Sequence, residues 1–189
     1  MKIYTKLFVL IIVLGLFTLS CKKDDETEKV EYVPAYYTEI DGNRVIMDTC
    51  YDIYSKDYSD DYYHNYLLVE KTVYYNDHMS SLLGKGSGFK MSFESNSNDL
   101  IAEGEYIFDP TATQPIPKRI VDANYYINYD YFMGEGDMIK MLSGKCVITK
   151  TAAADGYKLE GSFTGKNGKE YKIYYNSTIT QEYSDHSFW

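Results

Sequence analysis

The chain has 189 residues, of which 44% are hydrophobic, and this suits a single domain with one core. It carries 28 acidic and 19 basic residues, a formal net charge of −9. The excess of acid makes nucleic acid and anionic lipid poor partners, and mainly favours solubility.

The first 20 residues predict a secretory signal peptide. Lys2 and Lys6 give a positive start, residues 7–19 are strongly apolar, and Ser20 is a small residue at the expected cleavage point. The apolar run is shorter than the roughly 20 residues that a helix needs to span a hydrocarbon core. We therefore expect residues 1–20 to be removed.

Cys21 directly follows this segment. Its thiol can take a thioether-linked diacylglycerol and its freed amine a further acyl chain, and two or more chains anchor a protein stably. The stretch Thr18-Leu19-Ser20-Cys21 resembles a bacterial lipoprotein lipobox, although Thr18 stands where Leu is commonest. The resemblance implies lipidation at Cys21 and anchoring in the outer membrane.

The next charged residues, Lys23, Asp24, Asp25 and Glu26, resemble the lysine-plus-acidic signal that sends Bacteroidetes-type lipoproteins to the cell surface. The resemblance implies a domain that faces the cell exterior. The alternative is a charged, disordered tether without a sorting role. Residues 21–31 are then the lipidated tether, and residues 32–189 form one domain.

Composition and alternation predict an all-β domain. The chain holds 22 Tyr and 8 Phe, and aromatic residues favour half-buried strands. Apolar and polar residues alternate over 89–94, 157–163 and 171–175, and no long helical period is present.

Turn residues divide these runs into hairpins. Asp41-Gly42 joins 32–40 to 44–48 as an opening hairpin. Asp155-Gly156 and Asn167-Gly168 separate the strands of a closing meander, which are 144–149, 157–164 and 170–178. The longest predicted strand is 62–75, with Asn65, Leu67 and Val69 on one face and Tyr66 and Leu68 on the other.

The C-terminal half resembles a strand-turn pattern of small uncharacterised Bacteroidetes surface lipoproteins. The similar stretches are Gly104–Phe108, Ser143–Lys150, Gly156–Phe163 and 167–171. The resemblance implies an antiparallel β-sandwich or a calycin-like β-barrel built from hairpins, and it implies no activity.

Cys50 and Cys146 remain once Cys21 is acylated. An even pair in an exported protein is typical of a disulfide, which would stabilise the fold by about 4–5 kcal/mol in the chain-entropy model. The alternative is two buried thiols. Spacing along the chain does not decide between them.

No catalytic motif is found, so we expect a protein that is not an enzyme and has no cofactor. Only three His are present, without metalloprotease spacing. Asp52, Asp57, Asp60 and Asp61 could supply oxygen ligands to calcium, but they lack the regular loop spacing. A solvated acidic loop is the default interpretation, and no metal site is predicted.

Tyrosine is the remaining functional signal. Residues 52–64 are rich in Tyr and Asp without a clean period, and 109–118 contain three Pro, so both are predicted as loops. We expect Tyr58, Tyr62 and Tyr126 to contact a glycan or protein ligand, because Tyr packs on sugar rings and in interfaces. The alternatives are rings that pair across strands, and a structural or assembly component of a cell-surface complex.

Overall fold

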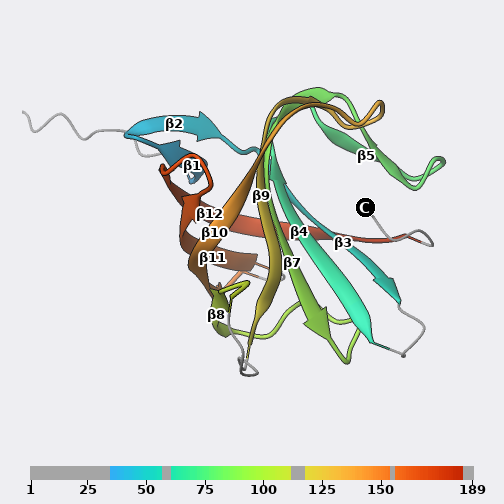
Figure 1. Ribbon diagram of the computed structural model, residues 1–189. Coiled ribbons are helices and arrows are strands. Elements are labelled where there is room, and N and C mark those ends of the chain that lie inside the picture. The colour runs from blue at the N-terminus through green and yellow to red at the C-terminus, as the bar shows by residue number, and fades with distance from the viewer. Residues whose placement is uncertain (1–34, 57–60, 112–117, 154–155, 185–189) are drawn as a thin grey trace, which may run out of the picture. The chain divides into compact units, whose positions relative to one another are not determined.

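The computed structural model describes residues 35–56, 61–111, 118–153 and 156–184, which belong to one compact unit, Pro34–Trp189 (Figure 1). All elements in these ranges are strands, and none of the described residues forms a helix. The strands are β1 (Tyr36–Ile40), β2 (Asn43–Ile46), β3 (Thr49–Lys56), β4 (Tyr62–Val69), β5 (Tyr74–Asn76), β6 (Ser81–Leu83), β7 (Lys85–Ser95), β8 (Gly104–Phe108), β9 (Ile120–Asp130), β10 (Glu135–Lys150), β11 (Gly156–Gly165) and β12 (Glu170–Tyr183).

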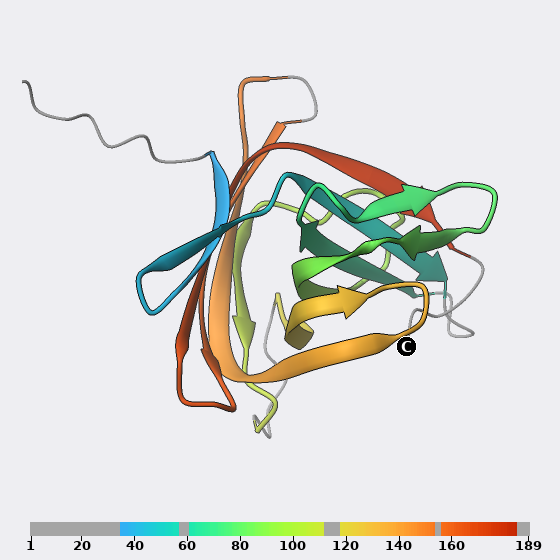
Figure 2. The same ribbon diagram turned by 90° about the horizontal axis from the view of Figure 1, so that it is seen from above.

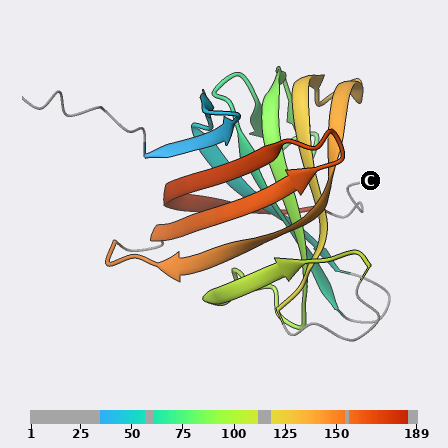
Figure 3. The same ribbon diagram turned by 60° about the vertical axis from the view of Figure 1, so that its left-hand side comes forward.

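The large sheet folds into two layers, as in a sandwich. Layer 1 has the strand order β2-β1-β12-β11-β10-β8 and faces the viewer in Figure 3. Layer 2 has the order β12-β3-β4-β7-β9-β10. The long strands β10 and β12 belong to both layers, and Figure 2 shows them (orange and red) bending between the two.

The large sheet is mixed, whereas the sequence predicted an antiparallel one. The C-terminal part of β12 runs parallel to β3, with Ile179 opposite Cys50 and Tyr183 opposite Tyr54. The other strand pairs of the described residues are antiparallel. The parallel pair arises because β12 leaves layer 1 and enters layer 2 beside a strand that is distant in sequence.

Buried side chains form two hydrophobic clusters, one on each face of layer 2. The larger cluster contains residues of both layers, among them Phe89 of β7 and Phe163 of β11, whose ring centroids are 5.0 Å apart. The smaller cluster lies on the opposite face of layer 2, where Val73, just before β5, and Leu82 of β6 in the separate β5–β6 hairpin pack against that layer. The hairpin is at the upper right of Figure 1.

The predicted faces of β4 are confirmed for its central residues. Tyr66 and Leu68 belong to the larger cluster, while Leu67 and Val69 belong to the smaller one. Both faces of β4 are therefore covered, which explains why four consecutive residues are apolar. The predicted continuation of this strand to residue 75 is wrong, because the chain turns after Val69 and begins β5 at Tyr74.

The opening hairpin is confirmed. Its strands are β1 and β2, and Asp41 and Gly42 have φ angles of 51° and 80°, as a tight primed turn requires. The closing meander of β10, β11 and β12 is also present, with Gly168 at a φ of 79°. Residues 112–117 of the predicted proline-rich loop and Asp155 of the Asp155-Gly156 turn lie outside the described residues.

The prediction of a loop over 52–64 is wrong at both ends of this range. Residues up to Lys56 are in β3, and β4 begins at Tyr62. Because the side chains of Asp52 and His64 hydrogen-bond to each other inside the sandwich, two polar residues face the core and interrupt the apolar alternation.

In the described ranges no helix is long and apolar enough to cross a membrane.

Candidate functional site

The outer face of layer 1 carries an open groove. Alternation along β12 places Tyr171, Ile173 and Tyr175 in the core, so Lys172 and Tyr174 point outward. The register sets Ser162 of β11 beside Lys172, and Tyr37 of β1 beside Tyr174. The face therefore collects side chains from the consecutive strands β10, β11 and β12 and from β1, which is distant from them in sequence.

The groove has a volume of about 320 Å³. This lies at the lower end of the range of roughly 300–1,000 Å³ that small-molecule sites occupy. Its lining residues are Tyr37, Lys145, Glu160, Gly161, Ser162, Lys172, Ile173 and Tyr174. Glu160 is the one carboxylate among them, so the facing pair of acids that glycoside hydrolysis uses is not present in this lining.

Two aromatic rings form one wall of the groove. Tyr37 and Tyr174 are stacked, with ring centroids 5.7 Å apart and an interplanar angle of 23°. Arg44 lies 4.7 Å from the Tyr37 centroid, and Lys158 lies 5.6 Å from that of Tyr174. These contacts order two half-buried rings at the protein surface before any ligand binds.

Charged side chains also line the groove, and two of them pair with carboxylates beside it. Lys145 pairs with Glu105 at 2.7 Å, and Lys172 pairs with Glu170 at 3.3 Å. The hydrogen bond from Ser162, followed by that from Lys172, lowers the pKa of Glu170 below its ordinary value. The groove thus offers ammonium donors, a hydroxyl and a carboxylate beside two aromatic rings.

The predicted contact residue Tyr126 is not at the surface. It is 4% exposed and packs against Tyr129 and Tyr131, with centroid separations of 4.8 and 5.8 Å. Burial raises the pKa of its hydroxyl well above the ordinary value. The prediction is therefore corrected, because the β5–β6 hairpin adds a second core on the face that Tyr126 occupies.

Tyr62 is half-buried, with Tyr54 6.4 Å from its ring centroid and Lys56 6.0 Å from it. It lies on β4, outside the lining of the groove. Tyr58 lies outside the described residues. The predicted contacts Tyr62 and Tyr126 are thus not part of this groove.

A second pocket lies beneath the hairpin, and side chains already fill it. Its lining consists of Ile53, Asn65, Leu67, Leu82, Lys90, Tyr126 and Tyr131. The open space is about 20 Å³, which is room for about one water molecule. Lys90 Nζ lies 3.5 Å from Asp122 Oδ2 at its edge. The pocket in this form is too small for a ligand.

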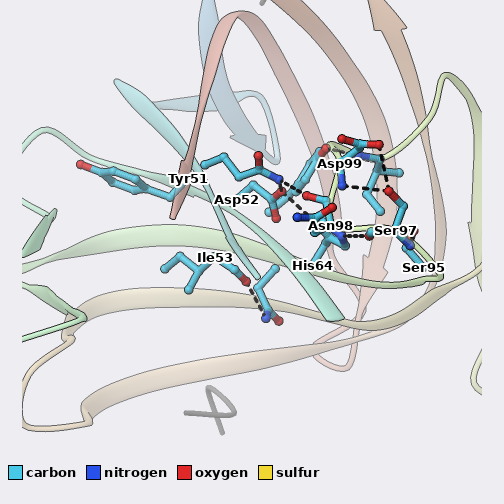
Figure 4. A network of polar contacts seen from close by, with 12 residues as sticks. Tyr51, Asp52, Ile53, His64, Ser95, Ser97, Asn98 and Asp99 are labelled. Carbon is cyan, nitrogen blue, oxygen red and sulfur yellow. Dashed lines mark hydrogen bonds and ion pairs between the residues drawn. The ribbon is translucent and has the colours of Figure 1, made fainter. Parts of the chain in front are cut away.

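Asp52 of β3 and His64 of β4 form a pair with fully buried side chains (Figure 4). His64 Nδ1 is 2.8 Å from Asp52 Oδ2, and His64 Nε2 is 2.9 Å from the carbonyl oxygen of Ser97. Tyr54 stacks on the imidazole at a centroid distance of 5.7 Å. Neither ring nitrogen is open to a substrate, so this pair is not an active-site dyad in the structure.

Cys50 and Cys146 are both fully buried and are free thiols. Burial raises the pKa of both thiols, that of Cys146 to about 12. Of the two alternatives that the sequence left open, the structure has the buried thiols and not the disulfide. Both are members of the larger core cluster.

The acidic residues considered for calcium are separated. Asp52 is inside the core and pairs with His64, so it is not part of a solvated acidic loop. Asp61 is half-buried, whereas Asp57 and Asp60 lie outside the described residues. Within the described ranges, no three His, Cys, Asp or Glu side chains gather as a metal ion would require. The lipidation site Cys21 and the export signal Lys23–Glu26 also lie outside these ranges.

Comparison with protein-family models, with curated proteins and with solved structures finds no match to this chain. The function must therefore be argued from the site itself. The sequence did not single out Tyr37 or Tyr174, although alternation over 171–175 already placed Tyr174 opposite the core residues. The pairing of β1 with β12, which brings the two rings together, has no signal in one sequence.

Proposed function

We propose that this protein is a cell-surface lipoprotein that acts as a non-catalytic binding module, with a glycan as its ligand. The observation that carries the proposal is the groove of layer 1, where the ordered rings of Tyr37 and Tyr174 lie beside Lys172, Ser162 and Glu160. Because the two rings stack on each other with Arg44 and Lys158 over them, their edges and hydroxyls would contact the sugar, and the polar side chains would accept from and donate to its hydroxyls.

The proposed location rests on the sequence. A lipid at Cys21 would hold the tether at the outer membrane, and Lys23-Asp24-Asp25-Glu26 would direct the domain to the exterior. A surface position fits a module that captures glycans, because such ligands meet the cell from outside.

The test is binding of the full-length lipidated protein, solubilised in detergent, to a glycan array. We expect Tyr174→Ala and Tyr37→Ala each to weaken capture by roughly 5–30-fold, which corresponds to about 1–2 kcal/mol. Tyr74→Ala is the matched control, because Tyr74 is 51% exposed and lies on the β5–β6 hairpin away from the groove.

The proposal is wrong if no glycan is retained, or if Tyr174→Ala and Tyr74→Ala reduce capture equally. If the protein instead captures a protein ligand, and Tyr174→Ala weakens that capture by the same factor, the groove is the binding site but its ligand is a protein and not a glycan.

A second function, as an assembly component of a cell-surface complex, is favoured by β2. This strand is at the end of the strand order, where β1 is its one neighbour among the described strands, and its Ile46 is 38% exposed. An edge strand can pair with another chain. A molecular mass in solution that increases with protein concentration would support assembly. A monomer at all concentrations would favour the binding module.

A further inference from the structure

The surroundings of His64 contain acceptors at both ring nitrogens. A backbone carbonyl such as that of Ser97 can only accept a hydrogen bond, and so can an ionised carboxylate such as that of Asp52. A neutral imidazole has one N–H and would leave one of these two short contacts without a proton. With Asp52 ionised, both contacts are made only when both ring nitrogens carry hydrogen.

Nearby charges favour the cation as well. Asp52 on β3 and Asp99 in the segment after β7 both act on His64, and both are negative. From β12, Gln181 adds a neutral amide, and from β3 the Tyr54 ring stacks on the imidazole. On β7, the residue opposite His64 is Phe93, which is apolar. A buried cation is tolerated when it is paired and hydrogen-bonded in this way.

The carboxylate of Asp52 is connected to the surface segment 97–101 through two side chains, those of His64 and Gln181. Asp52 Oδ2 accepts from His64 Nδ1 and, at 3.2 Å, from Gln181 Nε2. His64 then donates to the carbonyl of Ser97, and Gln181 donates to the carbonyl of Asn98 at 2.7 Å. Figure 4 shows Asp52 and His64 beside Ser97 and Asn98 of this segment.

The fastened segment ends at a core residue. Ile101 is 4% exposed, and its N–H donates to the Tyr66 hydroxyl at 2.9 Å. Asn98 and Asp99, in contrast, are exposed. Release of the segment would therefore uncover the core at Ile101 and Tyr66.

We propose that His64 is a buried imidazolium that latches residues 97–101 to the sandwich, and that loss of one ring proton at raised pH opens this segment. Nothing in this latch depends on the groove of layer 1 or on its ligand. It is a pH-sensitive closure of one end of the fold.

The direction of the pH dependence follows from the linkage between protonation of His64 and closure of the segment. Burial alone lowers the pKa of His64, but the hydrogen bond and charge of Asp52, the Ser97 carbonyl and the charge of Asp99 raise it above its ordinary value of about 6.5. His64 thus binds its second ring proton more tightly when residues 97–101 are closed on the sandwich than when they are open. Its stability is fully present below pH of about 6.5 and is lost as the pH rises through the raised pKa of the closed form.

The first experiment is nitrogen-15 NMR of the histidine rings in the full-length protein. We expect both ring nitrogens of His64 to be protonated at about pH 7, and the exposed His78 supplies reference signals from a histidine outside the network of Asp52. In Asp52→Asn the His64 titration should move to lower pH, because the charge that retains the second proton is gone. A single ring proton on wild-type His64 at about pH 7 would overturn the proposal, and this measurement needs no variant to fold.

The second experiment follows amide hydrogen exchange at Ile101 against pH, corrected for the intrinsic pH dependence. Between the ordinary and the raised pKa, opening should become up to about tenfold more frequent per pH unit. His64→Gln should exchange faster at every pH without this dependence, because one side-chain amide nitrogen cannot replace both ring donors. His78→Gln is the matched control and should behave as wild type. The same pH response in His64→Gln and wild type would refute the latch.

Discussion

The hydroxyl group of Tyr131 lies directly over Gly88, so that a Cβ atom added at Gly88 would overlap it. Tyr131 is 3% exposed, and burial raises the pKa of its hydroxyl, which stays protonated. Within the described part of the chain this hydroxyl has no hydrogen-bond partner. The side chain of Tyr131 thus fills the space above Gly88, but its hydroxyl oxygen is buried without a hydrogen bond in the described part of the chain.

Tyr131→Phe should leave the free energy of unfolding unchanged or raise it by up to about 1 kcal/mol, because it removes an unsatisfied buried hydroxyl. The control is the same substitution at Tyr66, whose hydroxyl accepts from the Ile101 N–H. Tyr66→Phe leaves that amide unpaired and should cost about 1–3 kcal/mol. Urea denaturation measures both variants, and a larger loss in Tyr131→Phe than in Tyr66→Phe would contradict this account.

The buried ring of Tyr126 and the half-buried ring of Tyr62 should respond differently to truncation. Tyr126→Ala removes a ring from the smaller core cluster and should lower the free energy of unfolding by about 3–5 kcal/mol. Tyr62→Ala should cost about 1 kcal/mol. Thermal and urea unfolding provide the comparison. Similar small losses in both variants would show that Tyr126 is not a core residue.

Alkylation tests the state of the two internal cysteines. In the native protein both thiols should resist a thiol reagent, because they are fully buried and burial raises their pKa. After unfolding in urea without reductant, peptides that contain Cys50 and Cys146 should each carry one adduct. If adducts form on these peptides only after reduction, the two cysteines form a disulfide.

In the proposed function, the lipid anchor would depend on the thiol of Cys21 alone. Cys21→Ala should leave the chain unprocessed by the lipoprotein pathway, because the acylation site is lost. Metabolic labelling with a fatty-acid analogue measures this directly, and Cys50→Ala is a control with the same chemical change at a buried site. Undiminished labelling of Cys21→Ala would rule out the lipobox.

In the proposed function, surface export would depend on the charged residues that follow Cys21 in the sequence. Replacing Lys23, Asp24, Asp25 and Glu26 together by Ala should preserve lipidation and hide the domain from protease added to intact cells. Replacing the nearby charged residues Glu28 and Lys29 by Ala should leave cleavage unchanged. If the fourfold variant is still cleaved on intact cells, residues 23–26 are a tether without a sorting role.

The sequence by itself determined the all-β class, the opening hairpin and the closing meander. Each depends on neighbours along the chain: apolar residues at every second position over 171–175, and Asp41-Gly42 or Asn167-Gly168 where positive φ angles are needed. The two faces of β4 were also assigned correctly, because side chains alternate whatever covers them. Local geometry alone sets these features.

Only the tertiary structure decided which rings are buried and which polar residues meet. Tyr126 is in a core because the β5–β6 hairpin covers the outer face of layer 2, and Tyr174 is in the groove because no strand covers that face of β12 in the described structure. Asp52 pairs with His64 because β3 and β4 set both toward the core within bonding distance. Burial and long-range pairing depend on the positions of segments distant in sequence, and alternation within a strand carries no information about them.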